Sequence, residues 1–159
     1  MNKVQPYIVQ GQKAIAPIPW QVHLCVERIE QPDWCFCGGT IIDEKTVLTA
    51  AHCVADTMKT PVSMNFIVAG IVSGTDSDHK VFVREIMIHE EYNDETIDND
   101  VAILKLRSAL IFDENVQPAC LPDPKFAPEN TEEIAVLSGW GDMREGKIQF
   151  YIKSTFSIQ

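Results

Sequence analysis

One histidine and one aspartate stand where side chains could carry out acid–base chemistry. His52 lies in the segment Thr49–Cys53, directly after a short apolar stretch, and Asp100 lies directly before the apolar run 101–106. A histidine that acts as a general base must be held in one tautomer, and a carboxylate removed from water does this by accepting its Nδ1–H. An aspartate at the start of an apolar strand suits that role, because burying it without a partner would be costly.

Each residue taken alone also has an ordinary explanation. A single histidine after a strand is usually a surface residue or a satisfied core residue, and an aspartate before a strand is usually a turn residue. The joint pattern of His52 and Asp100 is what favours a base with its orienting carboxylate.

Short strands are the elements that must position these two residues. Runs rich in Val, Ile and aromatic residues, mostly separated by turn residues, predict strands at Gln21–Val26, Trp34–Ile42, Thr46–Ala50, Ser63–Ala69, Val81–His89 and Val101–Leu106. Several short strands at this spacing favour an all-β sandwich or barrel. A single helical turn is expected around Ala51–Val54, and no internal repeat is seen.

The last third of the chain predicts a connector followed by a hairpin. Four prolines cluster at Pro118, Pro122, Pro124 and Pro128, which indicates an extended connector because proline lacks the N–H of a sheet ladder. Ile134–Trp140 predicts a strand, and Ile148–Ile158 alternates apolar and polar residues with the period of a strand. Such a hairpin is only marginally stable without further sheet.

Composition limits the classes of function. The 159 residues predict about one domain, and 45% hydrophobic with 23% charged residues is typical of a folded globular protein. A net charge of −10 argues against nucleic acid as a partner. No apolar run approaches the roughly 18 residues of a membrane span. The densest acidic residues, predicted to form a solvated loop, are Glu90, Glu91, Asp94, Glu95 and Asp98.

Five cysteines indicate an oxidising compartment, and the odd count leaves at least one thiol free or paired outside the chain. The first residues lack the apolar region of a signal peptide. We therefore expect a secreted, extracellular protein whose given sequence is incomplete at its start.

Five motifs in order identify a family. They are Cys37-Gly38-Gly39-Thr40, Leu48-Thr49-Ala50-Ala51-His52-Cys53, Asp100-Val101-Ala102-Ile103-Leu104-Lys105-Leu106, Cys120-Leu121-Pro122 and Ser138-Gly139-Trp140-Gly141. Together they resemble the chymotrypsin/trypsin family of serine endopeptidases. The resemblance implies two six-stranded antiparallel β-barrels with the active site between them. It assigns residues 8–120 to the first barrel, 121–133 to the connector and 134–159 to the truncated start of the second barrel.

The resemblance also implies roles for individual residues. His52 takes the place of the general base, and Asp100 that of the carboxylate that orients it. Ile8, in the segment Ile8-Val9-Gln10-Gly11, resembles the N-terminus that activation creates in this family, which makes residues 1–7 a propeptide remnant. The family commonly has Arg or Lys before that position, whereas this chain has Tyr7.

The nucleophile is not found in the sequence. The family order places it roughly ninety residues after the aspartate, beyond Gln159. None of the serines lies in a Gly-Asp-Ser-Gly-Gly motif: Ser63, Ser73, Ser77, Ser108, Ser138, Ser154 and Ser157. We therefore expect a serine endopeptidase homologue that is truncated before its nucleophile and inactive as these residues alone. The alternative is a naturally truncated, non-catalytic homologue that acts as a protein-binding module.

Disulfides follow from the same resemblance. Cys37 and Cys53 match the family disulfide that fixes the histidine loop. Cys25 and Cys35 would lie on adjacent arms of the first hairpin, where we expect a cross-strand disulfide; two unpaired thiols are the alternative. Cys120 matches a position that bridges to a propeptide in some members, and we expect it to be unpaired here.

No metal or cofactor is predicted. The histidines His23, His79 and His89 show no metal-ligand spacing, and Cys35-x-Cys37 is too short for a zinc knuckle. The family's calcium loop would correspond to residues 71–78, where Ile71 occupies the place of a ligand carboxylate. The expected partners are a protein or peptide substrate, once the missing half is supplied, and protease inhibitors.

Overall fold

The computed structural model describes residues 12–27, 34–55, 61–72, 79–121, 134–142 and 148–157. Several expectations concern residues outside this part of the chain. These are the propeptide remnant 1–7 with Ile8, almost all of the connector 121–133, most of the possible calcium loop 71–78 and the turn at 143–147.

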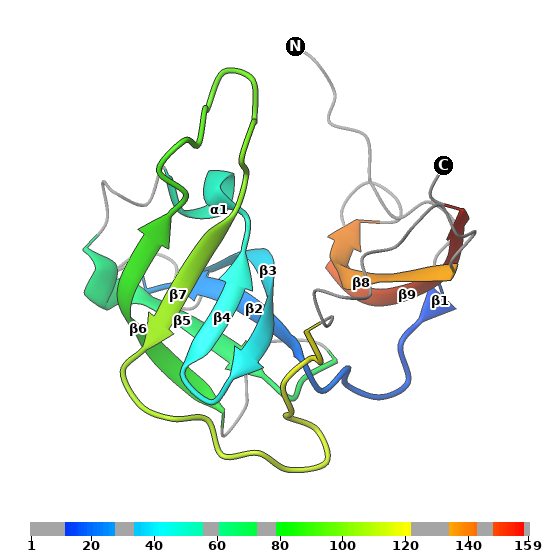
Figure 1. The fold of residues 1–159 in the computed structure, drawn as a ribbon. Helices are drawn as coiled ribbons and strands as arrows, with labels where there is room; N and C mark the ends of the chain where they lie inside the picture. Colours follow the sequence, from blue (N-terminus) through cyan, green and yellow to red (C-terminus); the bar gives the residue numbers. More distant parts are fainter. Residues whose placement is uncertain are drawn as a thin grey trace.

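Six antiparallel strands close into a barrel in the order β2-β3-β4-β7-β6-β5 (Figure 1). Their bounds are β2 Gln21–Val26, β3 Trp34–Asp43, β4 Thr46–Thr49, β5 Asn65–Ala69, β6 Lys80–Ile88 and β7 Ala102–Leu106. All six match predicted strands to within two residues at each end. The predicted all-β class and its barrel alternative are therefore confirmed. One helical turn, α1 (Ala51–Ala55), lies where it was expected, whereas the 3₁₀ turn η2 (Val62–Met64) was not predicted.

The barrel interior is filled by alternate residues of its strands. In β7, Ala102, Leu104 and Leu106 are buried while the two residues between them are partly exposed. This period of two aims every second side chain at the core. Gly39 is needed where β3 passes over the core, because a Cβ there would lie 2.8 Å from Cγ1 of Val47.

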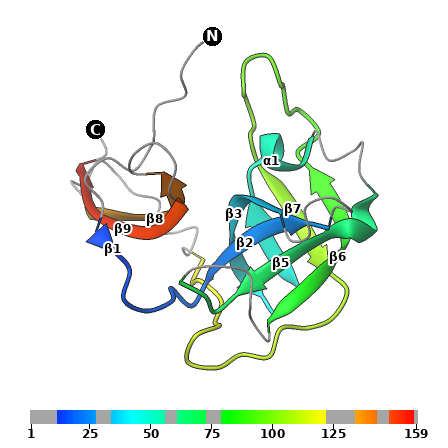
Figure 2. The ribbon, with the colours of Figure 1, turned by 180° about the vertical axis from the view of Figure 1, so that it is seen from behind.

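A second sheet contains three strands in the order β1-β9-β8, and Figures 1 and 2 show it beside the barrel. Its strands are β1 (Gln12–Lys13), β8 (Ile134–Asp142) and β9 (Ile148–Ser157). The predicted hairpin of β8 and β9 is present. The sequence assigned residues 8–120 to the first barrel, but β1 lies outside it and pairs with β9. The reason is that strands β2 to β7 already form a closed barrel, which has no free edge with which β1 could pair.

Candidate active site

His52 occupies the exposed side of α1. The residues on either side of it, Ala51 and Cys53, are buried, whereas the His52 side chain is 54% exposed. Cys53 is joined by a disulfide to Cys37 of β3. This disulfide attaches α1 to the barrel. A helix of only five residues is not stable by its own hydrogen bonds, so it depends on such contacts with the rest of the protein.

Asp100 is positioned by the strand next to the one that leads into α1. Strands β4 and β7 are neighbours, with Thr49 opposite Ala102. The chain leaves β4 toward His52 at the same end of the sheet at which it enters β7 from Asp100. Residues 48 positions apart in the sequence are thereby brought together.

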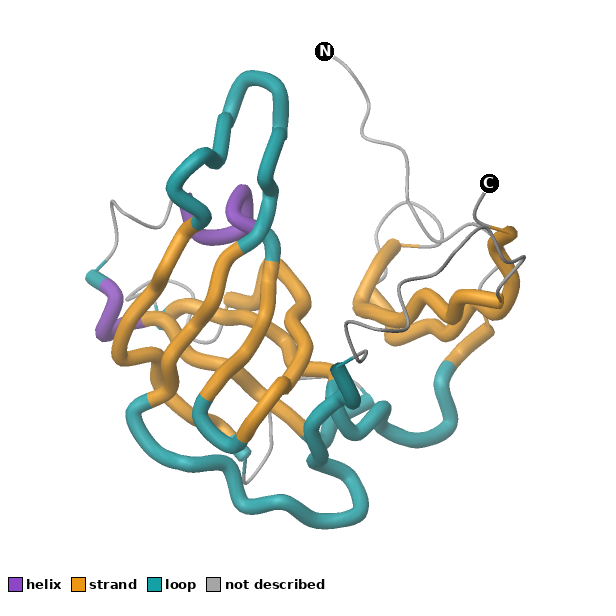
Figure 3. Tube along the Cα trace, viewed as in Figure 1, coloured by secondary structure: helices purple, strands orange, loops and turns teal. Residues whose placement is uncertain are grey.

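The loop between β6 and β7 holds Asp100 at its end, and Figure 3 shows this loop rising past α1. Asn99 adopts φ 54° and donates its side-chain N–H to the Glu91 carbonyl oxygen at 3.0 Å. Asparagine tolerates the left-handed region better than most residues. The five acidic residues predicted to be solvated are all exposed in this loop, so that prediction is confirmed.

Both carboxylate oxygens of Asp100 bind His52. Oδ2 lies 2.7 Å from Nδ1 of the ring, and Oδ1 accepts the His52 backbone N–H at 2.8 Å. These hydrogen bonds, the backbone one first, lower the pKa of Asp100 below its ordinary value. The ionised carboxylate only accepts hydrogen bonds, so the ring carries its proton on Nδ1 and presents a lone pair at Nε2. A ring in this tautomer is ready to act as a base.

Comparisons with known proteins identify the family of this chain. The family model described as Trypsin matches residues 8–156. The chain belongs to the trypsin family. It is 33% identical over 147 residues to ovochymase of Halocynthia roretzi and 34% identical over 142 residues to transmembrane protease serine 9 of Rattus norvegicus. Each alignment covers 87% of this chain.

Among solved structures, this chain resembles HL collagenase, with a TM-score of 0.75 and 27% sequence identity. The match covers 92% of this chain and 62% of the collagenase chain. The chain spans 9% of the length of the ovochymase and 13% of that of the transmembrane protease. The barrel is therefore a trypsin-type barrel, in a chain that spans less than two thirds of the length of each of these relatives.

Asp100 also lines a pocket of about 490 Å³. Its lining includes Gly38, Thr40, Thr49, Ala50, Asp100 and Ser138. The Asp100 side chain is 22% exposed because it lies at the wall of this pocket. The expectation of a desolvated aspartate is only partly met, since no described residue covers the pocket side of the carboxylate.

Ser138 is the serine that lines the pocket, and sequence reasoning did not place it near Asp100. Its hydroxyl donates a hydrogen bond to Gln21 Oε1 at 2.8 Å, which joins β8 to β2. No hydrogen bond between His52 and a serine is found in the described part of the chain. Ser138 therefore connects the two sheets and is not placed as a nucleophile.

Both predicted disulfides are present, Cys37 with Cys53 and Cys25 with Cys35, and Cys120 is a free, exposed thiol. In the part of the chain that is described, none of the helices has the length and hydropathy of a membrane-spanning helix.

Proposed function

We propose that this chain carries the base and the orienting carboxylate of a serine endopeptidase. The observation that supports the proposal is the double hydrogen bond from His52 to Asp100, at 2.7 Å to the ring and 2.8 Å to the backbone. A carboxylate that binds both groups fixes the tautomer of the ring and its direction. Membership of the trypsin family makes peptide-bond hydrolysis the reaction that this pair would serve.

In this mechanism His52 moves the proton and Asp100 does not. As a serine Oγ attacks the carbonyl carbon of the substrate, Nε2 of His52 takes the hydroxyl proton, and it then gives that proton to the leaving amine. Water next attacks the acyl-enzyme through the same base, releasing the acid and restoring the serine. Asp100 stays ionised and stabilises the imidazolium that forms in each half of the reaction.

The serine of this reaction lies outside the 159 residues in our proposal. None of their serines stands in a Gly-Asp-Ser-Gly-Gly motif, and the Ser138 hydroxyl already donates to Gln21. We expect no peptide hydrolysis from these residues alone. We further propose Ile8 as the N-terminus after activation, a protein or peptide as the substrate, and an extracellular location, which the two disulfides support.

A non-catalytic, protein-binding homologue is the second candidate. The pocket beside Asp100 favours it, because it leaves open a recessed surface that offers both polar and apolar groups. In that case the His52–Asp100 pair would have no reaction to serve.

A chimera tests the two candidates. The 159 residues are joined to the rest of a trypsin-family domain, for example that of rat transmembrane protease serine 9, and hydrolysis of peptide substrates is measured. We expect hydrolysis that His52→Ala abolishes and His79→Ala leaves intact, because His79 pairs with a different aspartate, Asp113. A folded chimera without activity, or one indifferent to His52→Ala, would contradict the catalytic proposal and favour the binding module.

A further inference from the structure

A small set of contacts, which we call the junction, joins the second sheet to the barrel. The indole of Trp140 in β8 stacks on the ring of His23 in β2, with centroids 4.3 Å apart and planes at 7°. Its Nε1–H donates to the Val72 carbonyl oxygen at 3.1 Å, and the Ser138 hydroxyl donates to Gln21 Oε1 at 2.8 Å. Of the five residues that make these contacts, only His23 has a side chain that takes up a proton as the pH falls below neutral.

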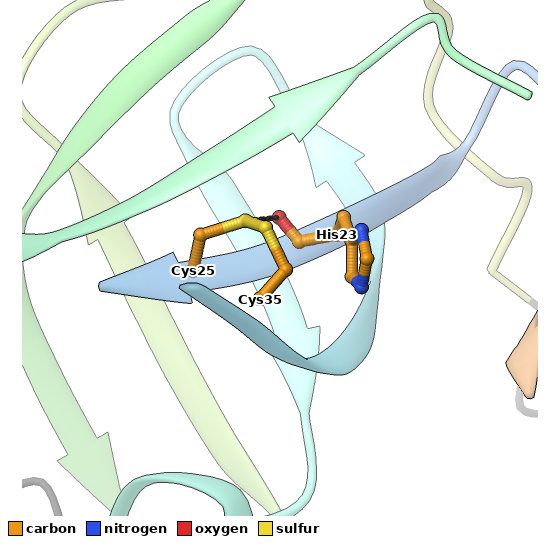
Figure 4. A group of neighbouring side chains, drawn as sticks. All are labelled: His23, Cys25 and Cys35. Atoms are coloured by element: carbon orange, nitrogen blue, oxygen red, sulfur yellow. Dashed lines mark hydrogen bonds between the residues drawn. A yellow bond between two sulfur atoms is a disulfide. The ribbon is translucent and has the colours of Figure 1, made fainter. Parts of the chain in front are cut away.

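The buried nitrogen of the His23 ring has no group beside it that could stabilise a positive charge. Its Nδ1 atom has no hydrogen-bond partner among the described residues. The residues opposite His23 in the neighbouring strands are Gly38 of β3 and Val68 of β5, and neither has a polar side chain. Figure 4 shows the ring beside the Cys25–Cys35 disulfide, whose sulfur atoms are only weak acceptors. A charged ring would therefore have no acceptor at Nδ1 in this part of the structure.

The charged groups on the strands around the ring do not offset such a charge. Lys80 of β6 lies opposite Val68 in the row of paired residues that contains His23, and its charge would have the same sign. Glu27, directly after β2, already pairs with Lys80, with 3.3 Å between Oε1 and Nζ. Asp43 occupies the last position of β3. These surroundings favour a neutral His23 ring.

Burial lowers the pKa of His23 to about 4, from an ordinary value of 6.5. Stacking on an indole attracts a cation, but this contact returns less than the removal of a charged ring from water costs. The neutral ring is therefore the form that fits between the barrel and the second sheet. Its contribution to the closed junction is complete above pH 6.5 and is lost as the pH falls toward 4.

We propose that His23 makes the junction sensitive to acid: a proton on the ring displaces it from its stack on Trp140, and β8 then separates from the barrel. The proton comes from solvent and returns to it when the pH rises, so the change is reversible. The hydrogen bonds of Ser138 and Trp140 cross the same junction and are lost with the stack. The three strands of the second sheet move together, because their ladder contains no barrel strand.

The junction also contributes to the pocket beside Asp100. Ser138 of β8 lines this pocket together with Gly38 and Thr49 of the barrel. Separation of β8 removes the Ser138 side of the pocket, next to the carboxylate that binds His52. This consequence for catalysis rests on the proposed function, whereas the acid-sensitive junction does not and can be tested without measuring activity.

Hydrogen exchange of the Trp140 indole N–H measures the opening of the junction, because the closed junction holds this group on the Val72 carbonyl oxygen. The full chain with Cys120→Ser, which removes the exposed free thiol, is followed by NMR at pH 7 and pH 5. Dividing each exchange rate by that of a free indole at the same pH gives the opening constant. A ring pKa of about 4 in the closed junction and 6.5 in the open one predicts that this constant rises about 20-fold from pH 7 to pH 5.

Two substitutions of His23 and one control locate the effect. His23→Phe keeps an aromatic ring against Trp140 and His23→Gln removes it, but neither side chain can gain the proton. The opening constant of both variants should therefore change by no more than about twofold between the two pH values. His89→Gln, at an exposed histidine after β6, should keep the full rise.

Exchange of a barrel amide separates opening of the junction from unfolding of the whole protein. The Leu104 backbone N–H of the buried strand β7 should open less often than the Trp140 indole at both pH values. Equal opening constants at the two groups would overturn the proposal, because the whole protein would then be unfolding. The proposal is also wrong if the wild-type chain shows no rise, if either His23 variant keeps it, or if His89→Gln loses it.

Discussion

His52 and His23 each lie close to a disulfide, but their rings have different environments. His52 is 54% exposed and its ring contacts a carboxylate at 2.7 Å. His23 has a buried Nδ1 with no hydrogen-bond partner among the residues that the structure describes, and its ring stacks on the indole of Trp140. Asp100 therefore holds a proton on Nδ1 of His52, whereas burial opposes any charge on His23. Residue type is the same at the two positions, and the groups around each ring decide what it can do.

The contrast follows from where each histidine lies in the barrel. His52 comes after a strand end, where loops supply polar partners and solvent reaches the ring. His23 lies within β2 between paired residues, Gly38 of β3 and Val68 of β5, with the second sheet above it. A proton shuttle needs the first environment, and a fixed structural contact needs the second.

The largest expected effect comes from removing the carboxylate that distinguishes His52. In the chimera, Asp100→Asn should lower kcat about 10⁴-fold, as the same change does in a well-studied Ser-His-Asp enzyme, because the amide favours the wrong tautomer. Steady-state hydrolysis of a peptide substrate measures this.

Asp113→Asn is the matched control for that change. Asp113 also contacts a histidine, His79, at 3.0 Å, but it lies away from His52. It should change kcat by no more than about twofold, as expected of an independent site. A fall of similar size in the two variants would mean that Asp100 acts only through stability.

The next effect separates the two disulfides. Their loops span 16 and 10 residues, so the chain-entropy model gives about 3 kcal/mol of stability to each. Cys37→Ala with Cys53→Ala should in addition lower kcat of the chimera, because it releases α1 and with it His52. Cys25→Ala with Cys35→Ala should leave kcat unchanged.

Urea unfolding and kcat, measured under conditions where both double variants remain folded, test this pair. Equal losses of kcat in the two variants would show that the Cys37–Cys53 bond has no particular part in holding the histidine.

A smaller effect depends on pH and on His23. The folded-state pKa of about 4 lies below the ordinary value of 6.5, so folding favours the neutral ring. The contribution of His23 to the free energy of unfolding is complete above pH 6.5 and is lost as the pH falls toward 4. Linkage gives a loss of about 2 kcal/mol at pH 5 relative to pH 7.

Urea unfolding at pH 7 and pH 5 measures this loss. In His23→Gln, which cannot gain the proton, this part of the pH dependence should disappear, whereas His89→Gln, at an exposed histidine, should keep it. If the free energy of unfolding falls equally between pH 7 and pH 5 in the wild type and in His23→Gln, His23 is not the source of this pH dependence.

Sequence reasoning reached the features that depend on local pattern. Runs rich in Val, Ile and aromatic residues predicted the barrel strands, and alternation predicted the last strand of the β8–β9 hairpin. The joint pattern of His52 and Asp100, each next to an apolar strand, predicted a base with its orienting carboxylate. The two side chains lie in contact because β4 and β7 are hydrogen-bonded neighbours, so their ends fix the separation of the side chains.

Other features depend on how the two sheets meet, and no local pattern reports that. Ser138 and Gln21 are 117 residues apart in the sequence, and the His23–Trp140 stack is a contact of the same kind. The short β1 lacks the length for a strand signal and exists because β9 offers it an edge. The residual exposure of Asp100 likewise follows from the pocket, which only the assembled barrel defines.

The smallest expected effect concerns the hydrogen bond between the sheets. Ser138→Ala removes the donor to Gln21 Oε1, a bond of 2.8 Å between partly buried groups, and should cost about 1 kcal/mol. The exposed Ser108 is a matched control, and Ser108→Ala should change stability by less than about 0.5 kcal/mol. Urea unfolding at pH 7 measures both, and Trp140 fluorescence reports whether its stack on His23 loosens. If Ser138→Ala behaves like Ser108→Ala, the His23–Trp140 stack, and not the hydroxyl, holds this edge of the second sheet against the barrel.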